Sequence, residues 1–216
     1  MDSSCSRREF FARLAQSACG LLAPSSAMAQ EEVPPVEVGF YKKLPDARIR
    51  CEICPKQCEV ADLERGYCGN KENRKGIYYS LVYGRCCSAH IDPIEKKPLF
   101  HYLPSTEAFS IAAAGCNFEC KFCQNWQIAQ YRPEQVEDFY LPPREVVSLA
   151  KEKKCPTIAY TYSEPVVFYE YMLDTAKLGR SKGIGSVMIS NGFINEAPLM
   201  ELCRHLTGVK IDLKGF

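Results

Sequence analysis

The chain has 216 residues, of which 46% are hydrophobic and 25% are charged, as is usual for a globular protein large enough to bury a core. Its 27 lysines and arginines nearly balance its 26 aspartates and glutamates, so the formal net charge is +1. This balance excludes the basic surface of a typical nucleic-acid-binding protein and an acidic tail. We therefore expect one large domain or two small domains that act on small molecules.

The first 29 residues resemble an export signal. Arg7-Arg8, followed by Phe10-Phe11, is similar to a twin-arginine motif, and Ala27-Met28-Ala29 is similar to a small-residue cleavage site. This resemblance implies that the chain folds and takes up its cofactor in the cytoplasm before export to the periplasm or beyond. The alternative is a cytoplasmic protein with a disordered or amphipathic N-terminus. The segment is too short and too polar to span a membrane, and we expect residues 30–45 to form a flexible lead-in.

Residues 46–104 are rich in cysteine, and four of these cysteines are closely spaced. Cys51, Cys54, Cys58 and Cys68 follow the pattern C-x2-C-x3-C-x9-C. Four thiolates can bind a structural zinc ion or a fully ligated iron-sulfur cluster. The spacing favours a metal over disulfides without identifying the metal. A segment of this size buries little apolar surface, so a metal would stabilise it. Short β-strands, such as 77–83, are expected around the site.

Between residues 105 and 216, apolar runs alternate with helical patterns, which predicts repeated β-α units with a parallel sheet. The predicted strands are 109–114, 157–162, 185–190 and 209–213, and the predicted helices are 143–154, 166–182 and 195–206. In such a sheet, ligands bind at the carboxyl ends of the strands. Polar residues and cysteines fall at all four ends, so we expect a single site there.

Three cysteines follow the first of these strands. Cys116, Cys120 and Cys123 have the spacing C-x3-C-x2-C, with no fourth cysteine close by. Iron-sulfur clusters take four ligands, so a [4Fe-4S] cluster on three thiolates keeps one iron open to a small molecule. An open iron indicates chemistry rather than electron storage.

These cysteines, with Phe122 before the last one, resemble the C-x3-C-x-aromatic-C signature of radical S-adenosylmethionine (SAM) enzymes. The run Gln124-Asn125-Trp126 and the run from Asp92 to Leu99 are similar to the branch related to pyruvate formate-lyase activating enzyme, notably the radical SAM enzyme of the AmmeMemoRadiSam system. This resemblance, from residue 48 onward, implies a partial (βα) half barrel with about four parallel strands. It also implies an oxidoreductase that binds a [4Fe-4S] cluster and SAM.

In that family, SAM chelates the open iron, and one electron cleaves it to methionine and a 5'-deoxyadenosyl radical that abstracts hydrogen. The resemblance implies that Phe122 packs near the adenine, with a core aromatic as the alternative. Glu164 stands where the family carries a carboxylate that meets the methionine amine, and Ser163 replaces a family glycine. The alternative for Glu164 is a carboxylate that favours a helix start.

The ends of the last two strands supply three more candidates. The resemblance implies that Asn191 reaches the ribose, although an ordinary Asn-Gly turn is an equal alternative. Asp212 and Lys214 resemble an Asp-x-Lys element, and the period of two places them on one strand face. A solvated charge pair is the alternative for these two residues.

The substrate is not identified by this resemblance. The family half barrel has six strands and the chain stops soon after the fourth, so we expect a truncated or split gene product that lacks the substrate wall. Expected partners are SAM, an electron donor and an unidentified substrate, with a protein that receives a glycyl radical as one candidate; no nucleic acid is expected. The alternatives are an iron-sulfur electron-transfer protein and an exported zinc-binding or disulfide-stapled interaction protein.

Overall fold

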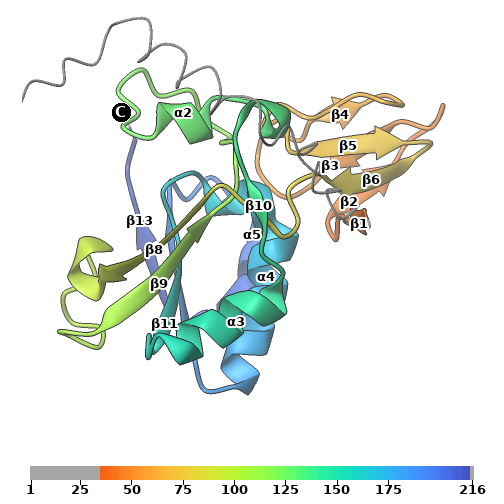
Figure 1. The fold of residues 1–216 in the computed structure, drawn as a ribbon. Coiled ribbons are helices and arrows are strands. Elements are labelled where there is room, and N and C mark those ends of the chain that lie inside the picture. Colours follow the sequence, from red (N-terminus) through yellow and green to blue (C-terminus); the bar gives the residue numbers. More distant parts are fainter. Residues whose placement is uncertain (1–34, 215–216) are drawn as a thin grey trace, which may run out of the picture. The chain divides into compact units, whose positions relative to one another are not determined.

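The computed structural model describes residues 35–214 (Figure 1). The predicted twin-arginine motif and its cleavage site lie outside these described residues. No helix in the described range is long and apolar enough to cross a membrane.

The main sheet has five strands in the order β13-β12-β11-β9-β8. Its parallel part consists of β9 (Glu107–Ala112), β11 (Thr157–Tyr160), β12 (Gly185–Ser190) and β13 (Gly208–Ile211). The four predicted parallel strands are therefore confirmed, and β12 has the predicted bounds. The strands form because their apolar runs are buried: every residue of β11 is buried, and in β9 only Glu107 is exposed.

The fifth strand of this sheet was not predicted. Strand β8 (Ser88–Pro93) pairs antiparallel with β9 along its whole length. It lies inside the segment 46–104 that the sequence assigns to the cysteine-rich part, so that part contributes an edge to the main sheet. Its mixture of polar and apolar residues, ending at Pro93, hides it from a search for apolar runs.

Three helices connect the parallel strands: α3 (Pro143–Glu152), α4 (Tyr169–Ser181) and α5 (Glu196–Cys203). Figure 1 shows all three on one side of the sheet. Each predicted helix is confirmed, but α4 begins at Tyr169 rather than at residue 166. The residues before it form the 3-10 turn η3 (Pro165–Phe168). Glu164 caps the start of this turn, where its side chain accepts a hydrogen bond from the Val166 amide at 3.1 Å.

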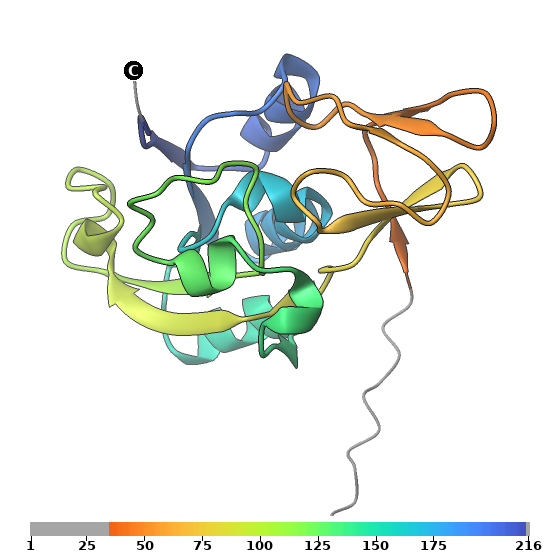
Figure 2. The ribbon, with the colours of Figure 1, turned by 90° about the horizontal axis from the view of Figure 1, so that it is seen from above.

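Residues 36–43, which were expected in a flexible lead-in, form strands β1 (Val36–Glu37) and β2 (Tyr41–Lys43) and join the cysteine-rich segment in small antiparallel sheets. These sheets lie beside one another at one end of the described residues (Figures 1 and 2). One sheet contains β1, β5 (Lys71–Arg74) and β6 (Ile77–Ser80), and another contains β2, β3 (Ile49–Cys51) and β4 (Glu59–Val60). The strand predicted at 77–83 is thus confirmed at its start. The remaining elements are β7 (Arg85–Cys86) paired with β10 (Phe139–Tyr140), η1 (Ile94–Lys96), α2 (Trp126–Ala129) and η2 (Pro133–Gln135).

One hydrophobic core joins the small sheets to the main sheet. Ile49 and Tyr78 from the small sheets belong to the same buried cluster as Phe168 and Met172 beside the main sheet. Phe40 also packs edge-on against Tyr169, with 5.5 Å between the ring centroids. The cysteine-rich segment therefore does not rest on a core of its own.

Gly115, three residues after β9, allows the cysteine-rich segment to approach the main sheet closely. Gly115 has a φ of +96°, and a Cβ atom there would overlap the side chain of Asn70 from the cysteine-rich segment. Asn70 is fully buried and donates a hydrogen bond to the carbonyl of Ala114. Only a residue without a side chain allows this approach.

Gly115→Ala should therefore destabilise the fold more than Gly183→Ala, which is a matched control. Gly183 also has a positive φ, of +74°, but no atom lies within 4 Å of the added Cβ. We expect the control to lose about 1 kcal/mol from backbone strain and Gly115→Ala to lose about 1–3 kcal/mol more from overpacking. Urea unfolding followed by circular dichroism measures both, and equal losses would contradict the close approach of Asn70.

Candidate functional site

The carboxyl ends of the parallel strands meet at one edge of the sheet, as the sequence predicts. The Glu164 amide, after β11, lies 3.5 Å from the carbonyl of Gly115, after β9. The Asp212 amide, after β13, donates to the carbonyl of Ser190 at the end of β12 with a distance of 2.8 Å. These backbone contacts link the end of β9 to that of β11 and the end of β12 to that of β13, and the loops that follow the strands form the site.

Glu164 is the most highly connected residue at this edge. Its side chain is 3% exposed, and one carboxylate oxygen accepts hydrogen bonds from the Ser190 hydroxyl at 2.6 Å and the Val166 amide at 3.1 Å. The other oxygen accepts from the Asn191 amide at 2.9 Å. Burial raises the pKa of Glu164, while these donors and the charge of Lys214 oppose that rise. In this structure the carboxylate fastens the end of β11 to the end of β12.

Asn191 connects this network to the cysteine loop through Asn117. The Asn191 side-chain amide donates to the Asn117 side-chain oxygen at 2.7 Å, and Asn117 donates to the carbonyl of Phe193 at 3.0 Å. Asn117 is 1% exposed. Sequence reasoning assigned it no role because an asparagine in a loop is common; its position directly after Cys116 is the signal that could have identified it.

The three thiols of the loop are free and partly buried. The Cys116 sulfur accepts a hydrogen bond from the Phe118 amide at 3.3 Å, and the Cys123 amide donates to the Cys120 carbonyl at 3.1 Å. Burial, together with the nearby Glu164 carboxylate and the other two thiols, raises the pKa of Cys116 to about 12. A thiol in such surroundings becomes a thiolate only next to a positive centre such as a metal. The donor set therefore fits a metal cofactor.

Among residues 35–214, no three histidine, cysteine, aspartate or glutamate side chains lie close enough together to hold one metal ion. The loop itself supplies three free thiols, the number that would leave one iron of a [4Fe-4S] cluster open.

The remaining predicted residues have different surroundings. Phe122 is 72% exposed among the described residues, and its place beside an adenine stays a prediction. The Ser163 hydroxyl donates to the carbonyl of Ala113 at 2.5 Å, so it braces the end of β9. Lys214 lies 3.1 Å from Asp212.

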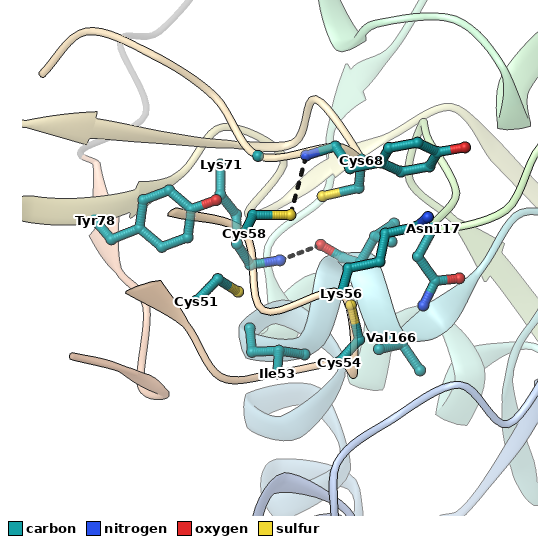
Figure 3. A pocket seen from close by; sticks show the side chains of 13 residues that line it. Cys51, Ile53, Cys54, Lys56, Cys58, Cys68, Lys71, Tyr78, Asn117 and Val166 are labelled. Carbon is teal, nitrogen blue, oxygen red and sulfur yellow. Dashed lines mark hydrogen bonds between the residues drawn. The ribbon is translucent and has the colours of Figure 1, made fainter. Parts of the chain in front are cut away.

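The second cysteine set is also brought together. Cys51, Cys54, Cys58 and Cys68 line one cavity, and none of them forms a disulfide (Figure 3). The structure thus gathers the four residues that the sequence groups, and the metal they would bind stays a prediction.

A buried charge cluster lies on the sheet below the strand ends. The Asp92 carboxylate pairs with Lys97 and Lys96, each at 2.6 Å, and accepts a hydrogen bond from the Tyr162 hydroxyl. Asp92 is 6% exposed and Lys97 is 2% exposed. Tyr162 follows β11 and directly precedes Ser163, so this cluster braces the turn that carries Glu164. The run from Asp92 to Leu99 carries a family resemblance in the sequence, but that resemblance predicts no role for its side chains.

With this geometry established, comparison with known proteins identifies the family. Residues 110–216, which contain the cysteine loop and all four parallel strand ends, match the Radical SAM superfamily. The chain is a member of the radical SAM superfamily. The superfamily resemblance expected from the cysteine motif is therefore confirmed.

Two curated relatives come from Methanocaldococcus jannaschii. The uncharacterized protein MJ0808 is 48% identical over 179 residues, which cover 83% of this chain and 53% of that protein. The uncharacterized protein MJ0674 is 34% identical over 108 residues, which cover 48% of this chain and 27% of that protein. The chain spans about half the length of the first relative and about a quarter of the second.

Asp92→Asn should lower the free energy of unfolding at pH 7 by about 3 kcal/mol, because the variant leaves Lys97 buried without its carboxylate. Burial alone would raise the pKa of Asp92, but the hydrogen bonds of Lys96 and Lys97 hold it well below its usual range. Its stabilisation is therefore present above about pH 4 and is lost as the pH falls further. Between about pH 5 and pH 2, the wild type should lose more stability than the variant.

Urea unfolding at several pH values measures this difference. Lys96→Met is the control, because Lys96 is 61% exposed and its pair with Asp92 should contribute less than about 1 kcal/mol. If Asp92→Asn and Lys96→Met lost the same stability at pH 7, the buried pair would not stabilise the fold.

Proposed function

We propose that this protein binds a [4Fe-4S] cluster and SAM at the carboxyl ends of its parallel strands, and generates a 5'-deoxyadenosyl radical for hydrogen abstraction. The observation that carries the proposal is the loop of three free thiols, fastened by Asn117 to the strand ends of a radical SAM superfamily chain. When bound, the cluster would supply the electron that cleaves the sulfonium of SAM. Three thiols leave one iron for the amine and carboxylate of SAM.

The chain's own residues would position these cofactors. Cys116, Cys120 and Cys123 would hold the cluster, while Glu164 would offer its negative charge to the methionine ammonium. A carboxylate about 4 Å from an ammonium gains on the order of 4 kcal/mol at an effective dielectric near 20. Burial at the strand ends would also keep water from the radical.

The remaining contacts to SAM are proposals of the same kind. Asn191 would reach the ribose, and Phe122 would cover the adenine. The charges of Asp212 and Lys214, which lie 3.1 Å apart, would complete the polar side of the site.

We further propose that the chain belongs to the branch related to pyruvate formate-lyase activating enzyme, near the AmmeMemoRadiSam radical enzymes. The support is the run Gln124-Asn125-Trp126 after the cysteines and the run from Asp92 to Leu99, in which Asp92 and Lys97 form the buried pair. A protein that receives a glycyl radical is one candidate substrate. The whole protein's substrate and its electron donor belong to this proposal.

Anaerobic reconstitution of the chain with iron and sulfide, followed by SAM and dithionite, should yield 5'-deoxyadenosine and methionine, measured by liquid chromatography. Replacing Cys116, Cys120 and Cys123 together by alanine should abolish the product, because the cluster loses all its protein ligands. Cys203→Ser is the matched control, since this cysteine is exposed and lies at the end of α5, and it should leave the yield unchanged. A cluster signal in electron spin resonance that SAM does not alter would contradict the proposal.

Glu164→Gln should weaken SAM binding by about 10- to 100-fold, because a hydrogen bond to a charged group contributes roughly 1.5–3 kcal/mol. Ser190→Ala is the comparison, since it removes a hydrogen bond to the same carboxylate but keeps the charge. It should lower stability and leave SAM affinity nearly unchanged. Calorimetric titration of SAM into the reconstituted protein measures affinity, and thermal unfolding measures stability. If both variants lost affinity equally, Glu164 would act only by holding the strand ends.

A further inference from the structure

The four cysteines of the N-terminal part come from separate turns of the chain and face one cavity. Cys51 ends β3, Cys54 and Cys58 lie in the loop before β4, and Cys68 lies in the loop before β5. Figure 3 shows their sulfur atoms arranged around the side chain of Lys71. None of the four forms a disulfide, and all of them line the same cavity.

The rest of the cavity is apolar on one side and carries a buried cation on the other. Ile53, Val166 and Val167 line it together with the thiols. The ammonium of Lys71 is the cation; its side chain is 2% exposed. Cys51 is buried and the other three cysteines are partly buried, so the apolar walls limit the access of water to the sulfurs. Such shielding is a property of sites that bind metals through thiolates.

The ammonium of Lys71 is only partly satisfied by the groups around it. It donates to the carbonyl of Val167 at 2.5 Å, and it lies 3.8 Å from the Glu170 carboxylate without a hydrogen bond to it. An ammonium carries three donors, so two of its hydrogens have no acceptor among the described residues. A negative group in the cavity would accept them.

A metal centre on four thiolates would supply that negative charge. Four thiolates carry four negative charges, which exceed the two positive charges of a zinc ion or of an oxidised [4Fe-4S] core. The remaining ammonium hydrogens of Lys71 could then point at sulfur atoms of the centre. The lysine and the thiols therefore complement one another in charge.

The position of the four thiols favours a redox-active centre over a structural ion. Asn117 of the cysteine loop lines the same cavity, and that loop belongs to a superfamily that binds a [4Fe-4S] cluster there. Four cysteine thiolates are the ligand set of a fully ligated [4Fe-4S] cluster.

We propose that Cys51, Cys54, Cys58 and Cys68 bind a second iron-sulfur cluster, fully ligated by cysteine, with Lys71 as its buried counter-charge.

The second cluster would lie next to the first. Asn117 of the cysteine loop lines the four-thiol cavity. Cys68 in turn borders a neighbouring hollow that Cys116 and Glu119 also line. This position suits the passage of electrons, a role that rests on the proposed function. A low-potential one-electron donor would reduce the second cluster by one electron, and that electron would pass to the loop cluster and then to the sulfonium of SAM, with no net change in either cluster.

The site is tested in the full chain by removing the other cluster. The variant with Cys116, Cys120 and Cys123 replaced by alanine, reconstituted without oxygen, should retain about four irons and four acid-labile sulfides per chain, against about eight of each in the wild type. Stoichiometric zinc without iron in this variant, or no metal at all, would overturn the proposal. This readout needs no SAM, so a wild type that binds eight irons and makes no 5'-deoxyadenosine would overturn only the proposed function.

A second set of variants guards against misfolding. In the wild-type background, Cys58→Ser and Cys68→Ser should each halve the bound iron, while Cys203→Ser should leave it unchanged. Lys71→Met should keep the iron but shift the potential of the second cluster to more negative values, because the cluster loses its neighbouring positive charge. Lys71→Arg should restore the potential. Unchanged iron in both serine variants would exclude the site, and an unchanged potential in Lys71→Met would exclude the role of the lysine.

Discussion

The buried carboxylate of Glu164 is the constraint on which the site depends. A carboxylate that is 3% exposed must be satisfied by the protein, and its hydrogen-bond donors come from Ser190, Asn191 and Val166. These hydrogen bonds hold the end of β11 next to the end of β12. They also orient Asn191, which holds Asn117 and through it the cysteine loop. The need to satisfy one buried carboxylate thus helps to position the loop that carries the three thiols.

Much of the main sheet could be predicted because its strands are buried on both faces. The run 185–190 is apolar and ends at an Asn-Gly turn, and β12 has those bounds. The other three predicted strands each run two residues too far, because strand pairing stops where the chain turns into the loops of the site. Strand β8 escaped prediction because Ser88, His90 and Asp92 interrupt its apolar residues, and only pairing with β9 makes it a strand.

In the site, too, features set by local sequence could be predicted, and features set by tertiary packing could not. Cysteine spacing is a local pattern, so both thiol sets could be grouped from the sequence, and the structure brings the members of the second set to one cavity. Asn117 and Lys71 could not be found this way. An asparagine or a lysine is usually a surface residue, and only the packing of distant segments buries these two. Sequence patterns therefore identify the ligands more readily than the residues that support them.

The hydrophobic core shared by the small sheets and the main sheet has a thermodynamic consequence. Because Ile49 and Tyr78 pack in the same cluster as Phe168 and Met172, neither part can lose its packing without exposing the other. Asn195 strengthens this connection, since its side chain donates to the Glu52 carbonyl at 2.7 Å, next to the four-thiol cavity. Unfolding of either part is therefore coupled to unfolding of the other. Any ligand that binds only the folded chain, at either thiol set, raises the melting temperature of both parts by mass action.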